Sequence, residues 1–177
     1  FMKKIRRLNN RGVTLVEVMM VLGVASILLG LAMTLMASVN ENRRANELKE
    51  EIITLAHISN ELSNSRVDFS NIHASTVVKS GLLPQRYISG GNIVTPYGSN
   101  VVLENYGSYQ NTISFWAYGL TREECILIVT TDFSGITSAM NTNWLYDSGG
   151  LPYTPQRAAS SCQTGSTNYI GMNFIKE

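Results

Sequence analysis

The chain has 177 residues, 44% of them hydrophobic, and a formal net charge of +1. This length accommodates one folded domain with an appendage, and a near-neutral charge gives no indication of a nucleic-acid partner. The charge is uneven, because the first twelve residues hold five of the fourteen Lys and Arg residues and no acid. A basic leader (residues 1–12) before an acidic body is typical of a signal that keeps the N-terminus cytoplasmic. We expect the native chain to begin at Met2 rather than at Phe1.

The segment 13–39 is apolar apart from one ionisable residue, Glu17. Its 27 residues correspond to about 40 Å of helix, against a hydrocarbon core of roughly 30 Å. The segment is longer than a secretory h-region, and no small-x-small cleavage site follows it. Gly23 and Gly30 fall on one helix face and favour close packing with neighbouring helices. The pattern predicts a helix that is surrounded by a membrane or by similar helices.

After Val39 the sequence becomes polar, but no proline or glycine ends the helix. Apolar or small residues recur at intervals of three and four, which predicts an amphipathic helix over residues 40–63. Most acids of this stretch, Glu51 among them, are expected off the apolar stripe. We therefore predict one helix from about Val13 to about Ser63, whose second half lies on a globular domain formed by residues 64–177. The stripe consists of Ala45, Leu48, Ile52, Leu55, Ser59 and Leu62.

The globular part is predicted to contain short elements. A helix is expected over residues 70–80, with Ser70 as its N-cap and Gly81 as its C-cap. The capping box Thr121–Glu124 predicts a second helix, which is expected to end at Ser134. Residues 89–92 and 151–161, rich in glycine or proline, are expected to be loops. Strands are predicted at 101–105, 112–118, 136–140, 144–146 and 169–175, which indicates an α+β fold with an antiparallel sheet.

The two cysteines, Cys125 and Cys162, are 37 residues apart and lie far from the apolar segment. An even number of cysteines beyond a membrane segment favours a disulfide in an oxidising compartment, here bounding residues 125–162. Closing a loop of this length would contribute roughly 3–4 kcal/mol in the chain-entropy model. Two buried free thiols are the alternative.

Other candidate sites favour ordinary structural roles. His57 and His73 have no cysteine or carboxylate at ligand spacing, and there is no C-x-x-C pair. Asp132 and Asp147 lack the clustered acids of a calcium loop, so turn roles are favoured. No nucleophile elbow or phosphate-binding glycine loop is present. We expect no metal, no cofactor and no enzymatic activity.

The run from Gly12 to Glu17, followed by the long apolar segment, resembles the class III signal of type IV pilins. The resemblance implies cleavage between Gly12 and Val13 by a prepilin peptidase, which also methylates the new N-terminus at Val13. It further implies the pilin fold, in which the second half of a long N-terminal helix packs on an antiparallel sheet.

Two further segments resemble the type IVb branch of this family. Leu120 and Thr121 precede Cys125 as a Leu-Thr pair precedes the first disulfide cysteine of those pilins, and Cys162 matches their second cysteine. The turn 95–98 is similar to their Asn-Pro-Phe-Gly turn, with threonine and tyrosine substituted. The resemblance therefore implies a Cys125–Cys162 disulfide.

Glu17 has two physical interpretations. A carboxylate within an apolar, membrane-buried helix costs a few kcal/mol unless it is paired or protonated. It either interacts with the positive end of its own helix or pairs with the Val13 amine of a neighbouring subunit, which exists only after cleavage. The residues alone leave both interpretations open, and the resemblance favours pairing.

The resemblance implies a pilus subunit that serves adhesion, aggregation, motility, DNA transfer or secretion. Its expected partners are identical subunits in a helical homopolymer, the prepilin peptidase, the inner-membrane assembly machinery and minor pilins. Before assembly it would span the inner membrane once with a cytoplasmic N-terminus, and after assembly it would be extracellular. The alternatives are a minor pilin or type II secretion pseudopilin, and a signal-anchored periplasmic binding or sensor domain.

Overall fold

The computed structural model describes residues 14–64, 72–105, 112–143, 145–147 (backbone alone), 151–165 and 167–175. The chain divides into two units, residues 1–39 and residues 40–177. The boundary falls within the first helix, and each unit is described by itself below.

Helix α1 extends over Leu15–Asn64, so the predicted single helix is confirmed for the described residues. Two hydroxyl groups in its apolar part, those of Ser26 and Thr34, donate hydrogen bonds of 2.8 Å to the carbonyls of Leu22 and Leu31. A hydroxyl that bonds back to its own helix needs no external partner, which suits apolar surroundings.

The second unit contains a five-stranded antiparallel sheet in the order β3-β4-β7-β5-β6, which confirms the α+β class. All five predicted strands are present, with ends that differ by one or two residues. The central strand β7 pairs with β4 and β5. The strands are β3 (Val102–Glu104), β4 (Thr112–Leu120), β5 (Thr137–Thr142), β6 (Leu145–Asp147) and β7 (Asn168–Ile175).

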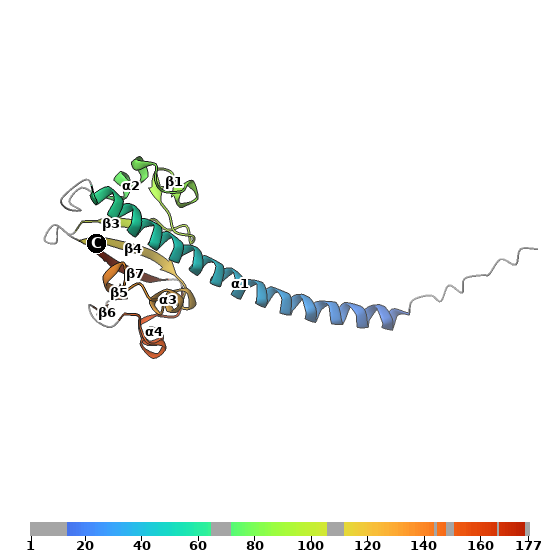
Figure 1. The fold of residues 1–177 in the computed structure, drawn as a ribbon. Helices are drawn as coiled ribbons and strands as arrows, with labels where there is room; N and C mark the ends of the chain where they lie inside the picture. The colour runs from blue at the N-terminus through green and yellow to red at the C-terminus, as the bar shows by residue number, and fades with distance from the viewer. Residues whose placement is uncertain are drawn as a thin grey trace, which may run out of the picture. The chain divides into compact units, whose positions relative to one another are not determined.

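The second half of α1 lies along this sheet (Figure 1), and both contribute to one hydrophobic core. Leu48, Ile52 and Leu55 of the predicted stripe are fully buried. On the sheet side, Phe115 and Phe174 stack with ring centroids 5.8 Å apart. Burying one aliphatic side chain of this size stabilises the fold by about 1.5–3 kcal/mol, so this interface is a main source of stability.

Helix α2 (Ala74–Ser80) ends at Gly81 as predicted, because Gly81 adopts the left-handed conformation with φ of 71°. Its N-cap is His73 and not Ser70, which lies outside the described residues. The prediction for this helix start is therefore wrong. A 3₁₀ turn, η1 (Gln85–Tyr87), follows α2.

Helix α3 (Arg122–Val129) begins with the predicted capping box but ends before the predicted Ser134. The hydroxyl groups of Thr130 and Thr131 donate hydrogen bonds of 2.8 Å to the carbonyls of Ile126 and Leu127. These side chains satisfy carbonyls of the last turn, so the helix ends there.

Two segments expected to be loops contain regular structure. Residues 155–161 form helix α4 (Pro155–Ser161), because Pro155 occupies the first helical position, where it is favoured, and Thr154 caps the helix through Oγ1. Strands β1 (Ile88–Ser89) and β2 (Asn92–Ile93) form a small hairpin. Its turn consists of Gly90 and Gly91, which both have positive φ, as a tight hairpin turn requires.

Candidate functional site

Thr14 caps the start of α1. Its carbonyl accepts hydrogen bonds from the N–H groups of Glu17 (3.1 Å) and Val18 (3.2 Å), and its Oγ1 accepts the Glu17 N–H at 3.3 Å. Glu17 therefore lies in the first turn, where the helix dipole favours a negative charge. Gly12 and Val13, the predicted cleavage and methylation site, lie outside the described residues.

The same Thr-x-x-Glu pattern begins α3, but the two acids behave differently. In α3 the box is complete: Thr121 Oγ1 accepts the Glu124 N–H at 3.3 Å, and Glu124 Oε2 accepts the Thr121 N–H at 2.8 Å. In α1 only the threonine half is formed, and the Glu17 carboxylate has no hydrogen bond or ion pair among the described residues. Glu17 thus occupies a capping position while its two carboxylate oxygens remain available to another molecule.

The first half of α1, which carries Glu17, is otherwise apolar and exposed. Every residue from Leu15 to Val39 except Ala25 is exposed in the isolated chain. A Cβ added at Gly23 or Gly30 would meet no atom within 4 Å. Within the described part of the chain, α1 alone is long and apolar enough to cross a membrane, judged by length and composition. An exposed apolar surface of this extent requires lipid or other proteins around it.

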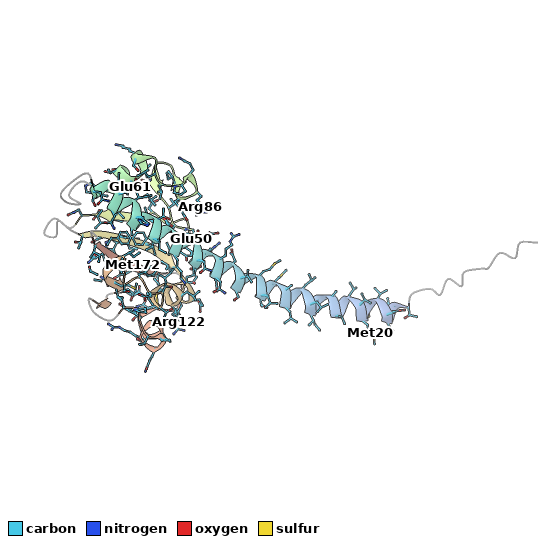
Figure 2. The ribbon with its side chains drawn as sticks, viewed as in Figure 1. Met20, Glu50, Glu61, Arg86, Arg122 and Met172 are labelled. Carbon is cyan, nitrogen blue, oxygen red and sulfur yellow. A yellow bond between two sulfur atoms is a disulfide. The ribbon has the colours of Figure 1, made fainter. Side chains whose placement is uncertain are left out.

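The predicted disulfide between Cys125 and Cys162 is present, with the two Cα atoms 5.9 Å apart. It joins α3 to the residue that follows α4. The Arg122 guanidinium, labelled in Figure 2, makes a second link between these helices. It donates hydrogen bonds to the carbonyls of Cys162 (3.2 Å) and Ala159 (3.0 Å), where a cation is favoured at a helix C-terminus.

A buried amide, Asn168, holds the segment after the disulfide, and the sequence analysis did not find it. Its Nδ2 donates to the carbonyls of Leu120 (3.1 Å) and Gln163 (2.9 Å), and its Oδ1 accepts the Gln163 N–H at 2.7 Å. The Asn143 side chain also donates to Asn168 Oδ1, while its own oxygen accepts the Tyr169 N–H at 3.2 Å. These contacts join residues far apart in the chain, so no local pattern indicated them.

The expectation that Glu51 lies off the apolar stripe is wrong, because its side chain is fully buried. Burial raises the pKa of its carboxyl from 4.5 to about 8. The spacing contained a signal: Glu51 is three residues after Leu48 and four before Leu55, which places all three on one helix face.

Three other charged residues on this half of α1 take part in exposed ion pairs. Arg43 and Glu47 are 3.4 Å apart, one turn from each other on the helix. Arg86 and Glu50 are 3.2 Å apart, and each side chain is 65% exposed (both are labelled in Figure 2). Exposed pairs of this kind contribute about 0–1 kcal/mol, so they add little to the stability of the fold.

Among the described residues there is no group of three or more His, Cys, Asp and Glu that would hold a metal ion. His57 is exposed, and the side chain of His73 makes no capping hydrogen bond. Asp132 has a turn role, because its carboxyl accepts hydrogen bonds from the hydroxyl and the N–H of Ser134, two residues later. These hydrogen bonds lower the pKa of the carboxyl. The side chain of Asp147 lies outside the described part of the structure.

Comparison with known proteins gives two family matches. Residues 37–175 match the family described as Bundlin, and residues 7–33 match the prokaryotic N-terminal methylation motif. None of the curated protein sequences matches this chain. The methylation motif covers the Thr14–Glu17 turn, and the Bundlin match covers the second half of α1, the sheet and both cysteines.

Two solved structures are similar to this chain, and the first supports the fold. A crystal structure of a type IV b pilin from Salmonella typhi is 18% identical, with a TM-score of 0.57, over 73% of this chain and 98% of that one. The structure of TcpA, a type IV pilin from the Vibrio cholerae El Tor biotype, is 11% identical with a TM-score of 0.47, over 76% of this chain and 98% of that one. Because the Bundlin match spans most of the sequence, the chain belongs to the bundlin family of type IV pilins.

Proposed function

We propose that this pilin is a structural subunit of a type IVb-like pilus, cleaved between Gly12 and Val13 and N-methylated at Val13. Before cleavage, α1 would anchor it in the inner membrane with the globular unit in the periplasm. After cleavage, identical subunits would assemble through α1 into an extracellular filament that serves adhesion, aggregation, motility, DNA transfer or secretion.

The observation that carries this proposal is the Glu17 carboxylate, which has no partner among the described residues and lies at the start of an exposed apolar helix. The same motif in α3 shows that this sequence pattern is able to form a complete capping box within one molecule. Among the described residues the Glu17 carboxylate makes no such contact, so a side-chain capping bond does not account for an acid in apolar sequence. Pairing with a cation on another molecule does, because a buried charge is tolerated when it is paired.

The partner cation in this proposal is the Val13 amine of a neighbouring subunit. Cleavage after Gly12 creates that amine at Val13, two residues before α1 begins at Leu15 and four residues before Glu17. An uncleaved chain has a peptide bond at this place and offers no charge. Moving α1 from lipid into a bundle of similar helices exchanges acyl-chain contacts for packing contacts of similar polarity. Processing would thus provide the charge that assembly requires.

The first test is mass spectrometry of the intact protein purified from its membrane or filament. The expected chain begins at an N-methylated Val13. A protein that retains residues 1–12 would contradict the proposal and would support a signal-anchored periplasmic binding or sensor domain. The abundance of the protein in purified filaments separates a major subunit from a minor pilin or secretion pseudopilin, which would be present in traces.

The second test separates pairing from capping. Glu17→Ala is expected to be cleaved normally but to be lost from filaments. Thr14→Ala is the matched control, because it removes the helix cap at 3.3 Å and keeps the carboxylate. Filament yield, normalised to mature protein detected by mass spectrometry, is measured for both. Normal filaments from Glu17→Ala, or an equal loss from Thr14→Ala, would contradict intersubunit pairing.

A further inference from the structure

The Glu51 side chain is fully buried on the face of α1 that also buries Leu48, Ile52 and Leu55. Both carboxylate oxygens of Glu51 are buried and have no hydrogen-bond partner among the described residues. The same holds for the Tyr97 hydroxyl and for Glu124 Oε1, the carboxylate oxygen that the capping box leaves unused. The three groups come from α1, from the turn 95–98 and from α3.

Charged groups of α1 and α3 act on Tyr97. The pKa of Tyr97 is raised, first by burial, then by the negative charge of Glu124, and also by those of Glu51 and Glu47. Arg44 is the cation that acts in the opposite direction. Arg44 is exposed, so its charge is screened by solvent.

Charged groups of α1 and η1 also act on Tyr87. Burial raises the pKa of Tyr87, a hydrogen bond from Arg86 lowers it, and the charges of Glu50 and Glu51 raise it. The Arg86 guanidinium donates to the Tyr87 hydroxyl at 2.8 Å and to Glu50 Oε2 at 3.2 Å. This cation is therefore engaged with Glu50 rather than with Glu51.

We propose that the protonation state of Glu51 controls how tightly the second half of α1 packs on the rest of the second unit (residues 40–177). As a neutral acid, Glu51 is tolerated in the apolar core, so α1 stays packed on it. As a carboxylate it is a buried charge with no ion-pair partner among the described residues, and the packing weakens.

The direction of the pH dependence follows from the pKa values. The Glu51 pKa is raised from 4.5 to about 8 by burial. Between these values the folded chain holds a proton that the unfolded chain has released. The stabilisation is therefore complete below about pH 4.5 and is lost as the pH rises towards 8. Across this interval the folding equilibrium constant falls by up to about tenfold per pH unit.

The test is denaturant unfolding of the full chain in detergent micelles at pH values from 5 to 9, followed by tryptophan fluorescence. Glu51→Gln keeps the shape and removes the titration, so its midpoint is expected to change much less with pH than that of the wild type. Glu50→Gln, which changes the adjacent exposed acid, is expected to keep the wild-type pH dependence. Equal pH slopes in the wild type and Glu51→Gln would overturn the proposal.

A second measurement does not require the Glu51 variant to fold. Glutamate carboxyl carbons are labelled with ¹³C and titrated by NMR in a Glu17→Gln chain, which removes the other acid in apolar surroundings. One carboxyl is expected to titrate near pH 8, against an ordinary value of 4.5. Titration of all glutamates near the ordinary value would overturn the proposal. Both experiments use the unassembled chain, so their outcome is independent of the proposed filament function.

Discussion

The two halves of α1 have one backbone and opposite environments. Leu29 in the first half is 61% exposed, whereas Leu55 in the second half is fully buried. The sequences differ in the width of the apolar surface: the first half is apolar on all sides, and the second half has a single stripe. A helix with one apolar stripe buries that stripe against another part of the same chain. A helix that is apolar on all sides needs lipid or another molecule around it. The width of the pattern therefore distinguishes a folding surface from an assembly surface.

The largest expected effect comes from a matched pair of leucines. Leu55→Ala should destabilise the globular unit by about 4 kcal/mol, because it leaves a cavity in the core. Leu29→Ala should change the stability of the detergent-solubilised monomer by less than about 0.5 kcal/mol. Denaturant unfolding of the two variants measures both values.

In filament assembly the two variants are expected to rank the other way, with the larger direct effect from Leu29→Ala. Leu29→Ala should reduce filament yield at normal amounts of folded subunit, because in the proposed filament its packing partner lies on another molecule. Comparable destabilisation of the monomer by both variants would remove the distinction between the two halves of the helix.

Replacing both cysteines by serine is expected to lower the stability of the globular unit by about 3 kcal/mol, because the loop of 37 residues is no longer closed in the unfolded chain. The apolar half of α1 should be unaffected, so membrane insertion of the variant should match the wild type. Thermal unfolding under oxidising conditions, with the reduced wild type as control, measures the change. A loss of insertion would show that the two units depend on each other.

A smaller effect is expected from Arg122→Ala, which removes two hydrogen bonds to carbonyls at the end of α4. The expected cost is about 1–2 kcal/mol, since hydrogen bonds from a charged group are stronger than neutral ones. Arg43→Ala, which breaks an exposed pair, is the control and should cost less than about 0.5 kcal/mol. Amide hydrogen exchange in α4 should increase in the first variant and not in the second.

The smallest effect is expected at the exposed pair of Glu50 and Arg86. Glu50→Gln should cost less than about 1 kcal/mol, and the cost should disappear at high salt. Unfolding midpoints at low and high ionic strength provide the measurement. A cost that persists at high salt would mean that this surface is tied to the core more strongly than its exposure indicates.

The elements that sequence analysis predicted are those specified by local patterns. The period of three and four residues predicted α1, the Thr121–Glu124 box predicted the start of α3, and the Cys125–Cys162 disulfide followed from cysteine number and family resemblance. Helix α4 is not predicted, because two prolines in residues 151–161 indicate a loop. Pro155 nevertheless favours a helix, because it occupies a first helical position. Proline position, and not proline number, was the informative feature.

The remaining misses depend on tertiary contacts. Asn168 hydrogen-bonds to Leu120, which is 48 residues away, and no spacing rule connects them. Glu51 was assigned by its charge to the solvent side, although its position on the helix placed it in the stripe. In both cases a polar side chain is buried because of what surrounds it, and residue type alone indicates the opposite.

Arg122 contacts the carbonyl of the residue whose sulfur forms the disulfide. The ion–dipole contact with Cys162 and the covalent bond between Cys162 and Cys125 therefore act in parallel on the same point of the chain. Because Arg122 needs no oxidant to make its contact, it is able to hold Cys162 beside α3 in the reduced chain. Folding would then bring the two thiols of the chain together before any oxidising enzyme acts, and oxidation would fix an arrangement that already exists.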